Sequence, residues 1–466
     1  MAKKISRRDF LRMSALTAAG AALAGCAQPT PEVQIVEQTV EVPVEVEVEK
    51  TVEVPVEQTV VVQPTAPPEL EGTLRVSAES WIIQKWPVEK VAQLFMDDHP
   101  GVTVEVSPAP SKGEGETYLI QWSQGRTNVD VALGGSKSDV ATYVGQDLLV
   151  EFGDDFFTGD FARDEFIEAF LQEGEFAGGK QYAVPLLGEV MYTTVRRDWY
   201  EEAGLLDADG KPIPPKDWDG WKEYADALTI PGERSGLAIS WGTNFMWQQY
   251  LTGLQVSKGS IYESEGSTMV DFSSEYAEAL LQFWQDIVNA GYAPTGTFTD
   301  QNANRNDFKA GLIGSMITAH SRWPECEQVL EAGGEDLVTA MPILEGAGTL
   351  AYAHTIYVPK ESPVPDLAKA FVKEQILSLY GQQWSANNYG KLPTLKRNFA
   401  VLDAPEYQDI LAAAAVGVHE PNYKEQRELN AVLQVELEKC ITGAQTPADT
   451  LANLQDAAKG FDLSLV

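Results

Sequence analysis

The alternation of apolar and polar residues predicts a strand, a helix and a second strand at the start of the globular part of the chain. Residues 73–77 alternate as a half-buried strand does, residues 88–95 carry apolar side chains at helical spacing, and residues 102–106 alternate again. Pro100 and Gly101 follow the predicted helix and end it before the second strand begins. A strand, a helix and a strand within about 35 residues form a βαβ unit, which predicts parallel strands joined by a right-handed crossover.

Later segments continue this alternation of strands and helices. Residues 129–133 are predicted to form a third strand. Ser274 is placed to cap a helix that ends at Gly291, and Pro365 opens another helix that carries apolar residues as far as Leu377. Strands that alternate with helices along the chain predict an α/β fold.

Two loops follow predicted strands and are candidates for ligand binding. Residues 79–81 come after the first strand, and residues 134–136 come after the third. In open α/β sheets, ligands bind beyond the carboxyl ends of the strands. We therefore expect side chains of these two loops to meet at a binding site.

The first 26 residues hold two sorting motifs in order. Arg7 and Arg8 precede a short apolar stretch at residues 15–23, and the sequence LAGC ends at Cys26. The first motif resembles a twin-arginine (Tat) export signal, and the second resembles a bacterial lipobox, whose cysteine carries diacylglycerol. The apolar stretch is shorter than the roughly 20 residues that a membrane-spanning helix needs. These motifs predict an extracytoplasmic protein anchored to the cell membrane by a lipid on Cys26; the alternative is an amphipathic tail with a chance cysteine.

A low-complexity segment separates these motifs from the globular part. Residues 27–71 are rich in Val, Glu and Pro, and the sequence TVEVPVE occurs at residues 39–45 and again at residues 51–57. Charges of one sign repel each other, and prolines interrupt strand pairing, so we expect an extended, disordered tether. The alternative is a β-rich stalk for oligomerisation.

Net charge limits the classes of partner. The chain carries a formal charge of −35, and its first 25 residues are basic, so the remainder is more acidic still. Such a body repels nucleic acid and anionic lipid headgroups. It also argues against a polyanionic ligand, although a local basic pocket remains compatible with it.

The inventory of reactive residues predicts a protein that is not an enzyme and needs no cofactor or metal. The sequence has no nucleophile elbow, phosphate-binding loop, HExxH helix or dinucleotide fingerprint, and its four histidines are scattered. Beyond Cys26 there are two cysteines, Cys326 and Cys440. They form either a disulfide or two buried thiols.

Tryptophans provide the positive signal. The chain has 11, and Trp81, Trp241, Trp247 and Trp323 stand beside polar residues in turn-like contexts. An aromatic ring packs on the apolar face of a sugar while neighbouring polar groups bind its hydroxyls, so this pattern suits a carbohydrate site. The alternative is that each ring is part of the core.

Seven sequence blocks occur in an order that resembles one protein family. They are GTLRV, FMDDHPGVTVEV, NVDVALGG, GGKQYAVPLLGEVMY, PKDWDGWKEYADAL, FKAGLIGSMITAHSRW and YGKLPT. Over residues 72–466 the chain resembles the extracellular solute-binding proteins of ABC importers, family 1, which include maltodextrin-binding proteins. It departs from the family pattern at Ser315, at residues 320–322 and at Val195-Arg196, which bears on the ligand more than on the fold.

This resemblance implies a two-lobed α/β fold of the type II periplasmic-binding-protein class with a ligand cleft between the lobes. We expect a signal peptide at residues 1–25, the lipidated cysteine and tether at residues 26–71, one lobe at residues 72–187 and 356–398, and a second lobe at residues 188–355 and 399–466. Matching the blocks implies a set of ligand-contact residues: Glu79, Trp81, Gly135, Ser136, Glu189, Asn244, Trp247, Trp323 and His354.

The resemblance also implies a function. The protein is expected to act as a monomer that captures a carbohydrate, in particular an oligosaccharide, by lobe closure and delivers it to an ABC permease. A non-sugar solute such as a polyamine is the alternative ligand. Two other functions remain: an exported carbohydrate hydrolase that uses Glu79 and Glu189 as its carboxyl pair, and a sensor subunit.

Overall fold

The predicted βαβ unit opens the globular body. The structure, a computed structural model, describes residues 69–466 except 111–113, 136, 177, 243–244, 330–336, 347 and 403. Strand β1 (Glu71–Ala78) and strand β2 (Gly101–Pro108) pair in parallel along their whole lengths, with helix α3 (Val88–Asp98) between them. This confirms the prediction from the alternating pattern. The predicted export signal, Cys26, Ser136 and Asn244 lie outside the described residues, and so does the predicted tether except for residues 69–71, the last of which begins β1.

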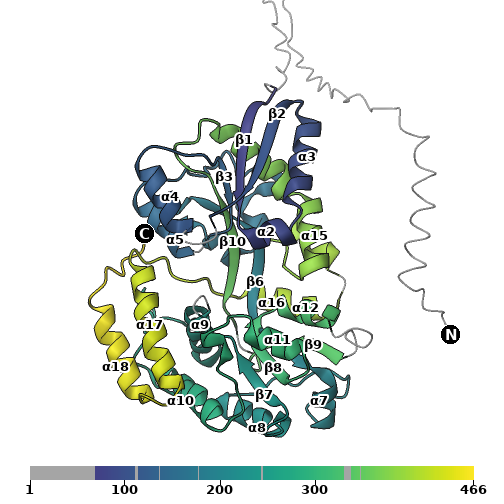
Figure 1. The fold of residues 1–466 in the computed structure, drawn as a ribbon, viewed down its shortest axis with the longest axis vertical. Coiled ribbons are helices and arrows are strands. Elements are labelled where there is room, and N and C mark those ends of the chain that lie inside the picture. Colours follow the sequence, from purple (N-terminus) through teal and green to yellow (C-terminus); the bar gives the residue numbers. More distant parts are fainter. Residues whose placement is uncertain are drawn as a thin grey trace, which may run out of the picture. The chain divides into compact units, whose positions relative to one another are not determined.

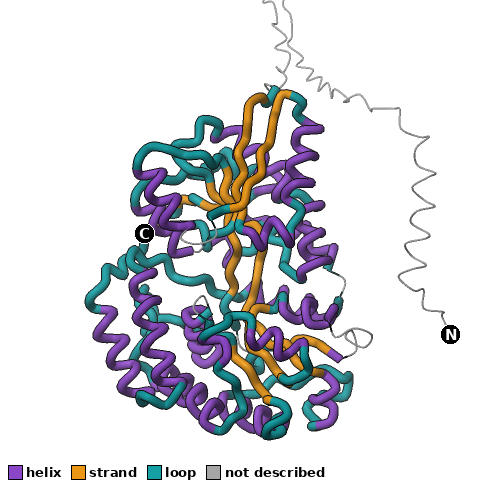
Figure 2. Tube along the Cα trace, in the orientation of Figure 1, coloured by secondary structure: helices purple, strands orange, loops and turns teal. Residues whose placement is uncertain are grey.

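A long strand, β6 (Ala183–Arg196), organises the sheet. All of its 14 residues are buried. Its first half pairs with β10 (Ala351–Tyr357), and its second half pairs with β8 (Ile313–Ala319) and β9 (Val338–Met341). The strand order is β2-β1-β3-β10-β6-β8-β7, with β9 added beside β6 (Figure 2). One strand therefore carries backbone pairing from the N-terminal half of the sheet into the C-terminal half.

The remaining elements complete this sheet or pack around it (Figure 1). On the N-terminal side they are α2 (Ser80–Lys85), α4 (Glu114–Ser123), β3 (Val131–Leu133), α5 (Lys137–Gly145), α6 (Glu168–Gln172), the small pair β4 (Glu175–Phe176) and β5 (Lys180–Gln181), α14 (Pro365–Phe371) and α15 (Leu379–Tyr389). On the C-terminal side they are α7 (Arg197–Glu202), α8 (Trp218–Leu228), β7 (Ser235–Ile239), α9 (Met246–Lys258), α10 (Glu275–Asn289), α11 (Ala303–Lys309), α12 (Arg322–Val329), α16 (Glu406–Ala415), α17 (Gln426–Ile441) and α18 (Pro447–Ala458).

Two of these helices test the expected boundaries. Ser274 caps α10 by accepting a hydrogen bond from the amide of Ala277, and Gly291 follows the helix with a φ of +76°. Pro365 begins α14 as expected, but the α-helical part ends at Phe371 and a π-helical turn follows over Val372–Ile376. The apolar pattern predicted the buried face of this segment without revealing the change in hydrogen bonding.

The packing falls into separate apolar cores. One core surrounds β1 to β3 and includes Val76, Phe95 and Phe371; a second surrounds β7 and α10 and includes Trp284 and Leu433. We call the parts built on these cores the first and second lobes. A third core, which includes Phe170 and Trp323, draws residues from both predicted lobes. The exact lobe boundaries stay predictions.

Glycine fixes the point where β6 leaves the first lobe. A Cβ atom at Gly188 would lie 2.1 Å from the ring of Phe170, so no other residue fits there without displacing that ring. The backbone of Gly188 exchanges two hydrogen bonds with Leu392, at 2.9 and 3.0 Å. Beside it, the pairing of β10 with β6 shifts register between His354 and Thr355. A register shift of this kind changes the direction of the side chain beside it, and His354 stands at that position.

Both alternatives for the cysteines can now be compared. Cys326 and Cys440 are free thiols, and each is buried in a different core. The thiols therefore serve as small apolar packing groups. No helix among the described residues has the length and apolar character that crossing a membrane requires.

Candidate functional site

The two predicted ligand loops do lie together. The carboxylate of Glu79 accepts hydrogen bonds from the amide of Gly135 and from the indole N–H of Trp81. Gly135 has a φ of +91°, and a Cβ atom there would lie 2.7 Å from the hydroxyl of Tyr357. Only glycine fits both the backbone conformation and the space. Glu79 thus ties the loop after β1 to the loop after β3.

The ring of Trp81 faces strand β10 and remains partly exposed. Its centroid lies 4.6 Å from that of His354, with the ring planes tilted by 60°. Tyr352 stands next to His354 on the same face of β10, with ring centroids 6.2 Å apart. Trp81, Tyr352 and His354 form a continuous aromatic wall, and we use that name for them below.

A buried ion pair lies beside the aromatic wall. Glu189, on β6, is 1% exposed and contacts the ammonium of Lys391, which is 6% exposed. The hydroxyl of Ser321 donates to the same carboxylate at 3.1 Å. The Lys391 ammonium lies 5.3 Å from the centre of the Trp81 ring. Burial, with a smaller effect from the positive charge of Lys85, lowers the pKa of Lys391 to about 7.

The second oxygen of Glu189 has no donor. His320 Nδ1 lies 3.4 Å away, but it already accepts a hydrogen bond from the amide of Val190 at 3.2 Å. The other ring nitrogen donates to the carbonyl of Gly390 at 2.8 Å. Burial lowers the pKa of His320 to about 4, so the ring is neutral at pH 7. Glu189 Oε2 is therefore a buried acceptor left without a partner among the described residues.

A second polar cluster bridges from α5 in the first lobe to α9 in the second. Lys137 pairs with Glu173 at 3.2 Å and also contacts the backbone carbonyl of Glu420. Gln248 donates to the side chain of Glu420 at 2.7 Å. Burial raises the pKa of Glu173 to about 8 and also raises that of Glu420. Lys137 thus contacts the buried carboxyl group of Glu173 and the backbone of Glu420, whose own buried carboxyl group is held by Gln248.

The expected site residues fall into three groups. Glu79, Trp81, Gly135, Glu189 and His354 come together at the aromatic wall, although their contacts with a ligand stay a prediction. Ser136 and Asn244 lie outside the described residues. Trp247 and Trp323 are each 3% exposed and belong to apolar cores.

The ring of Trp323, expected from the sequence to contact ligand, is buried in this structure. It packs edge to face on Tyr407 of α16, with ring centroids 5.3 Å apart. Tyr407 lies 84 residues after Trp323 in the sequence, so no local sequence pattern could predict this contact. A ligand-binding role for Trp323 stays a prediction, but of the three candidate tryptophans only Trp81 presents a partly exposed ring.

Several polar residues of the site were missed by sequence reasoning. They are Lys391, Ser321, Lys137, Glu173 and Glu420. Lys137 follows the Gly134–Ser136 loop directly, which was a usable signal. The others are brought in by long-range packing, and single charged residues in an acidic chain carry no pattern.

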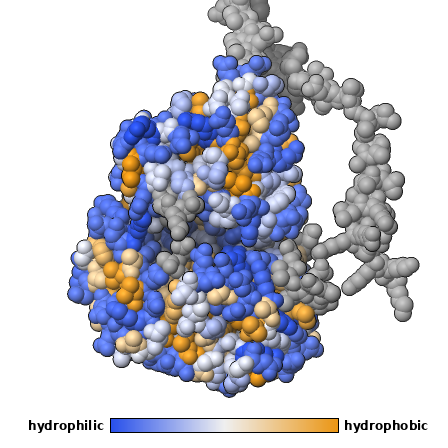
Figure 3. Space-filling view, in the orientation of Figure 1, coloured by the Kyte–Doolittle hydropathy of each residue, from blue (hydrophilic) through white to orange (hydrophobic). Residues whose placement is uncertain are grey.

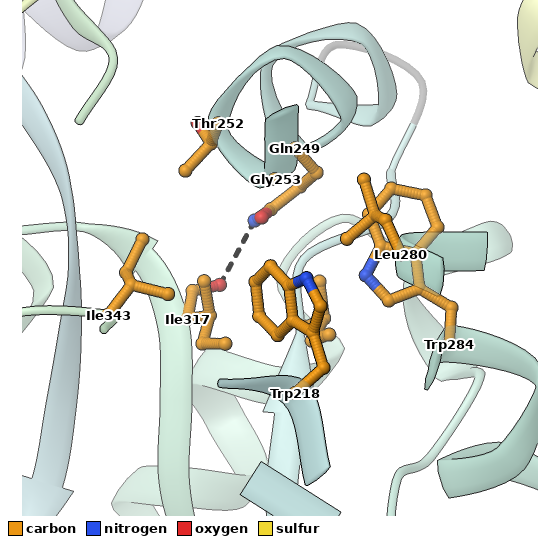
Figure 4. A pocket seen from close by; sticks show the side chains of 9 residues that line it. Trp218, Gln249, Thr252, Gly253, Leu280, Trp284, Ile317 and Ile343 are labelled. Atoms are coloured by element: carbon orange, nitrogen blue, oxygen red, sulfur yellow. Dashed lines mark hydrogen bonds between the residues drawn. The ribbon is translucent and has the colours of Figure 1, made fainter. Parts of the chain in front are cut away.

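A pocket elsewhere in the second lobe is too small to be the site. It lies among α9, α10, β7 and β8, and Trp218, Gln249, Thr252 and Trp284 contribute to its lining (Figure 4). Gln249 crosses it to donate to the carbonyl of Ile317 at 3.0 Å. Its volume of about 10 Å³ holds about one water molecule at most. This pocket is a packing defect of the core and cannot admit a sugar.

The two carboxylates considered for hydrolysis are engaged by other groups. Both oxygens of Glu79 accept hydrogen bonds from N–H groups, and Glu189 contacts a lysine and a serine. A general acid needs a proton to give and access to the scissile oxygen. Nothing in these contacts favours that role. The described residues contain no group of three or more His, Cys, Asp or Glu side chains arranged to hold a metal.

Comparison with known proteins gives consistent matches. The family model of bacterial extracellular solute-binding proteins matches residues 81–376, more than half of the chain, and the model of the twin-arginine export signal matches residues 4–24. The export signal is therefore confirmed. A mannitol-binding protein of Pseudomonas aeruginosa is 23% identical over 317 residues, which cover 63% of this chain and 67% of that protein.

Solved structures share the fold at low identity. The GacH receptor of Streptomyces glaucescens, solved without ligand and with acarbose, matches with a TM-score of 0.71 and 19% identity over 84% of this chain and 98% of its own. A solute-binding protein of Thermotoga lettingae bound to α-D-tagatose matches with a TM-score of 0.71 and 16% identity, over 84% and 99% of the two chains. These similarities confirm the expected two-lobed α/β fold.

The buried pair generates a first prediction. Lys391→Met leaves the Glu189 carboxylate buried without its cation, and should lower the free energy of unfolding by about 3–5 kcal/mol. The double variant Glu189→Gln/Lys391→Met removes both charges and should recover most of that loss. Urea denaturation of the three proteins checks this. Equal unfolding midpoints for wild type and Lys391→Met would show that the pair contributes nothing to the fold.

The buried histidines generate a second prediction. Burial lowers the pKa values of His320 and His354 to about 4 and that of His419 to about 3, against about 6.5 in an unfolded chain. The unfolded state binds more protons in this window, so the free energy of unfolding should fall as the pH drops from 6.5 to 4. Removing one such histidine should reduce that slope by up to about 1.4 kcal/mol per pH unit.

The measurement compares His320→Gln with the wild-type protein. Urea titrations at several pH values should give a shallower dependence of the free energy of unfolding on pH for His320→Gln. Glu173 acts in the opposite direction between pH 4.5 and 8 because its pKa is raised, but it is common to both proteins. Identical slopes for the two proteins would contradict the assignment of a neutral, buried His320.

Proposed function

The chain belongs to the family of bacterial extracellular solute-binding proteins, and from that premise we propose that it captures a carbohydrate between its lobes and delivers it to an ABC permease. The observation that carries the proposal is the aromatic wall. Trp81 offers a partly exposed ring flanked by Lys391 and the unpartnered oxygen of Glu189. A sugar matches this arrangement, since its C–H face packs on the ring while its hydroxyls meet the polar groups.

Ligands of the similar proteins agree with this choice. Mannitol, acarbose and α-D-tagatose are all polyhydroxylated, although they range from a single sugar unit to a longer compound. The departures at residues 320–322 place His320 and Ser321 against Glu189. We therefore expect the ligand's identity to depend on residues that differ from the usual family pattern.

Capture requires closure of the two lobes on the ligand. Chain crossings converge at Gly188, His354 and Leu392, next to the aromatic wall. Residues from both lobes line the site only when the lobes approach, so a ligand that contacts both shifts the population toward the closed form. The closed form is then the state that a permease recognises.

A polyamine fits the site less well. Such a cation needs carboxylates that are free to receive it. Glu79 is occupied by N–H donors, Glu189 by Lys391, and Glu173 by Lys137, while Arg322 adds a further positive charge nearby. Among the described residues, the carboxyl groups of this site are therefore already engaged by other side chains or by backbone amides.

The carbohydrate assignment is tested by thermal shift and calorimetry with mannitol, tagatose, maltose and acarbose, and with spermidine and amino acids for comparison. A polyol or sugar should raise the melting temperature, since it binds only the folded form. Trp81→Ala should weaken that binding about ten- to hundredfold with little change in the stability of the free protein.

Trp323→Ala is the matched comparison. Because its ring is buried on Tyr407, this variant should lose stability and keep its affinity once folded. The reverse pattern would make Trp323 the stacking surface. Binding of spermidine with no response to any sugar would contradict the carbohydrate assignment.

Membrane anchoring is the second element of the proposal. The chain is exported, and we propose that Cys26 receives a lipid and that the Val/Glu/Pro segment holds the body away from the membrane. Cys26→Ser should leave the exported protein unanchored, so that it appears in the soluble extracytoplasmic fraction. Fractionation and mass spectrometry of the N-terminus check this. Membrane retention of Cys26→Ser with unchanged mobility would contradict lipid attachment.

A further inference from the structure

Positive charges gather around one carboxylate of the second lobe in a protein that is otherwise strongly acidic. Arg305 and Lys309 of α11 and Arg322 of α12 all contact one carboxylate, that of Glu325. The distances from Glu325 to Arg305 and Arg322 are 3.2 and 2.9 Å. Among the described residues, these three cations share a single anion, so this part of the second lobe carries a local excess of positive charge.

A fourth cation faces this group from the other lobe. Lys85 ends helix α2, and its ammonium lies 5.3 Å from the centre of the Tyr389 ring. Burial is the main cause that lowers the pKa of Lys85; the negative charge of Glu325 opposes this shift, and the positive charges of Arg322, Arg305 and Lys309 add to it. Within the described part of the chain, no carboxylate lies within ion-pair distance of Lys85. We call Lys85, Arg305, Lys309 and Arg322 the basic cluster.

The basic cluster adjoins the proposed sugar site. Arg322 follows Ser321, which bonds to Glu189, and its charge lowers the pKa of His354 in the aromatic wall. Lys85 in turn lowers the pKa of Lys391, so these two ammonium groups are also within electrostatic range. One continuous region therefore holds an aromatic wall and an excess of cations.

The carboxylates near the basic cluster offset only part of this charge. Glu79 keeps its negative charge, because its two hydrogen-bond donors are neutral N–H groups, whereas Glu189 is matched by Lys391. Farther away, Lys137 pairs with Glu173 and contacts the backbone of Glu420. Among the described residues, Glu325 is the only carboxylate within ion-pair distance of the basic cluster, so a local excess of positive charge remains although the chain carries a formal charge of −35.

Lobe closure makes this arrangement selective. Lys85 comes from the first lobe and the other three cations from the second, so closing the lobes brings like charges together. Like charges in a partly desolvated cleft repel each other, whereas an anion held between them is attracted by both sides. An anionic ligand consequently stabilises the closed form more than a neutral one of the same shape.

We infer that the ligand is an anionic carbohydrate, a sugar that bears a carboxylate, sulfate or phosphate group, with its ring on Trp81 and its acidic group between Arg322 and Lys85. This inference rests on the proposed carbohydrate-binding function and narrows it. The net negative charge of the whole protein repels an anionic ligand at long range. At the site itself, the basic cluster attracts it. The guanidinium of Arg322 suits a planar or tetrahedral oxyanion through paired N–H groups.

The experiment measures binding of matched neutral and acidic sugars to the full-length chain in detergent by calorimetry. The pairs are galactose with galacturonate, galactobiose with digalacturonate, and glucose with glucose 6-phosphate and glucose 6-sulfate. At least one acidic member should bind about tenfold to hundredfold more tightly than its neutral partner. That advantage should shrink as the salt concentration is raised, because salt screens partly exposed charges. The preferred member identifies the anion.

Variants locate the effect. Arg322→Gln and Lys85→Gln should each remove most of the preference for the acidic member and leave the affinity for the neutral one nearly unchanged. Arg322→Lys should keep part of the preference. Lys459→Gln makes the same change of charge on the exposed end of α18 and should have no effect. The melting temperature of each variant is recorded, and Lys85→Gln, which lies at a partly exposed helix end, carries the test if Arg322→Gln fails to fold.

The outcomes separate this inference from the proposed function. If neutral sugars bind as tightly as their acidic partners, or if both Gln variants fold and keep the preference, the anionic assignment is wrong and carbohydrate binding stands. If spermidine or an amino acid binds and no sugar of either kind does, both are wrong. A preference for an acidic member that disappears in the Gln variants supports the inference.

Discussion

A buried carboxylate and a buried ammonium meet where β6 passes from one lobe to the other. Glu189 stands on the fully buried strand, and Lys391 reaches it from the segment that crosses back beside Gly188. Neither group can be left alone in the interior, because an unpaired buried charge costs several kcal/mol. The pair therefore fixes the alignment of two crossing segments, and the aromatic wall, His320 and Ser321 are all positioned around it.

The electrostatics of the cleft oppose those of the molecule. Polar residues cover most of the visible face of the body (Figure 3), and acidic residues outnumber basic ones by 69 to 34 in the sequence. Yet the ammonium of Lys391 lies beside the Trp81 ring, and the charges of Lys85 and Arg322 act on Lys391 and His354. Salt screens electrostatic interactions over about 10 Å, so the net negative charge of the protein has little effect on a bound ligand. The nearby positive charges act on that ligand at contact distance. Selection of the ligand is then governed by the cleft and not by the net charge.

Sequence pattern predicted what local periodicity controls. The first βαβ unit, the Ser274 cap and the meeting of the loops at Trp81 and Gly135 all follow from short-range rules and from the order of the family's blocks. It did not predict Lys391 in the site, because a single lysine has no periodic signal and is placed only by long-range packing. It also gave no sign that Trp323 is buried, since the ring that covers it comes from a helix far along the chain.

Hydrogen exchange of the full-length protein, with and without its tightest-binding sugar, tests the central claim most directly. Binding between the lobes should slow exchange in segments from both: residues 79–85 of the first lobe, residues 320–325 of the second, and the crossings near Gly188 and His354. Local opening there is suppressed when a ligand bridges the lobes. Protection confined to one lobe, or centred on the small pocket among α9, α10, β7 and β8, would contradict the account.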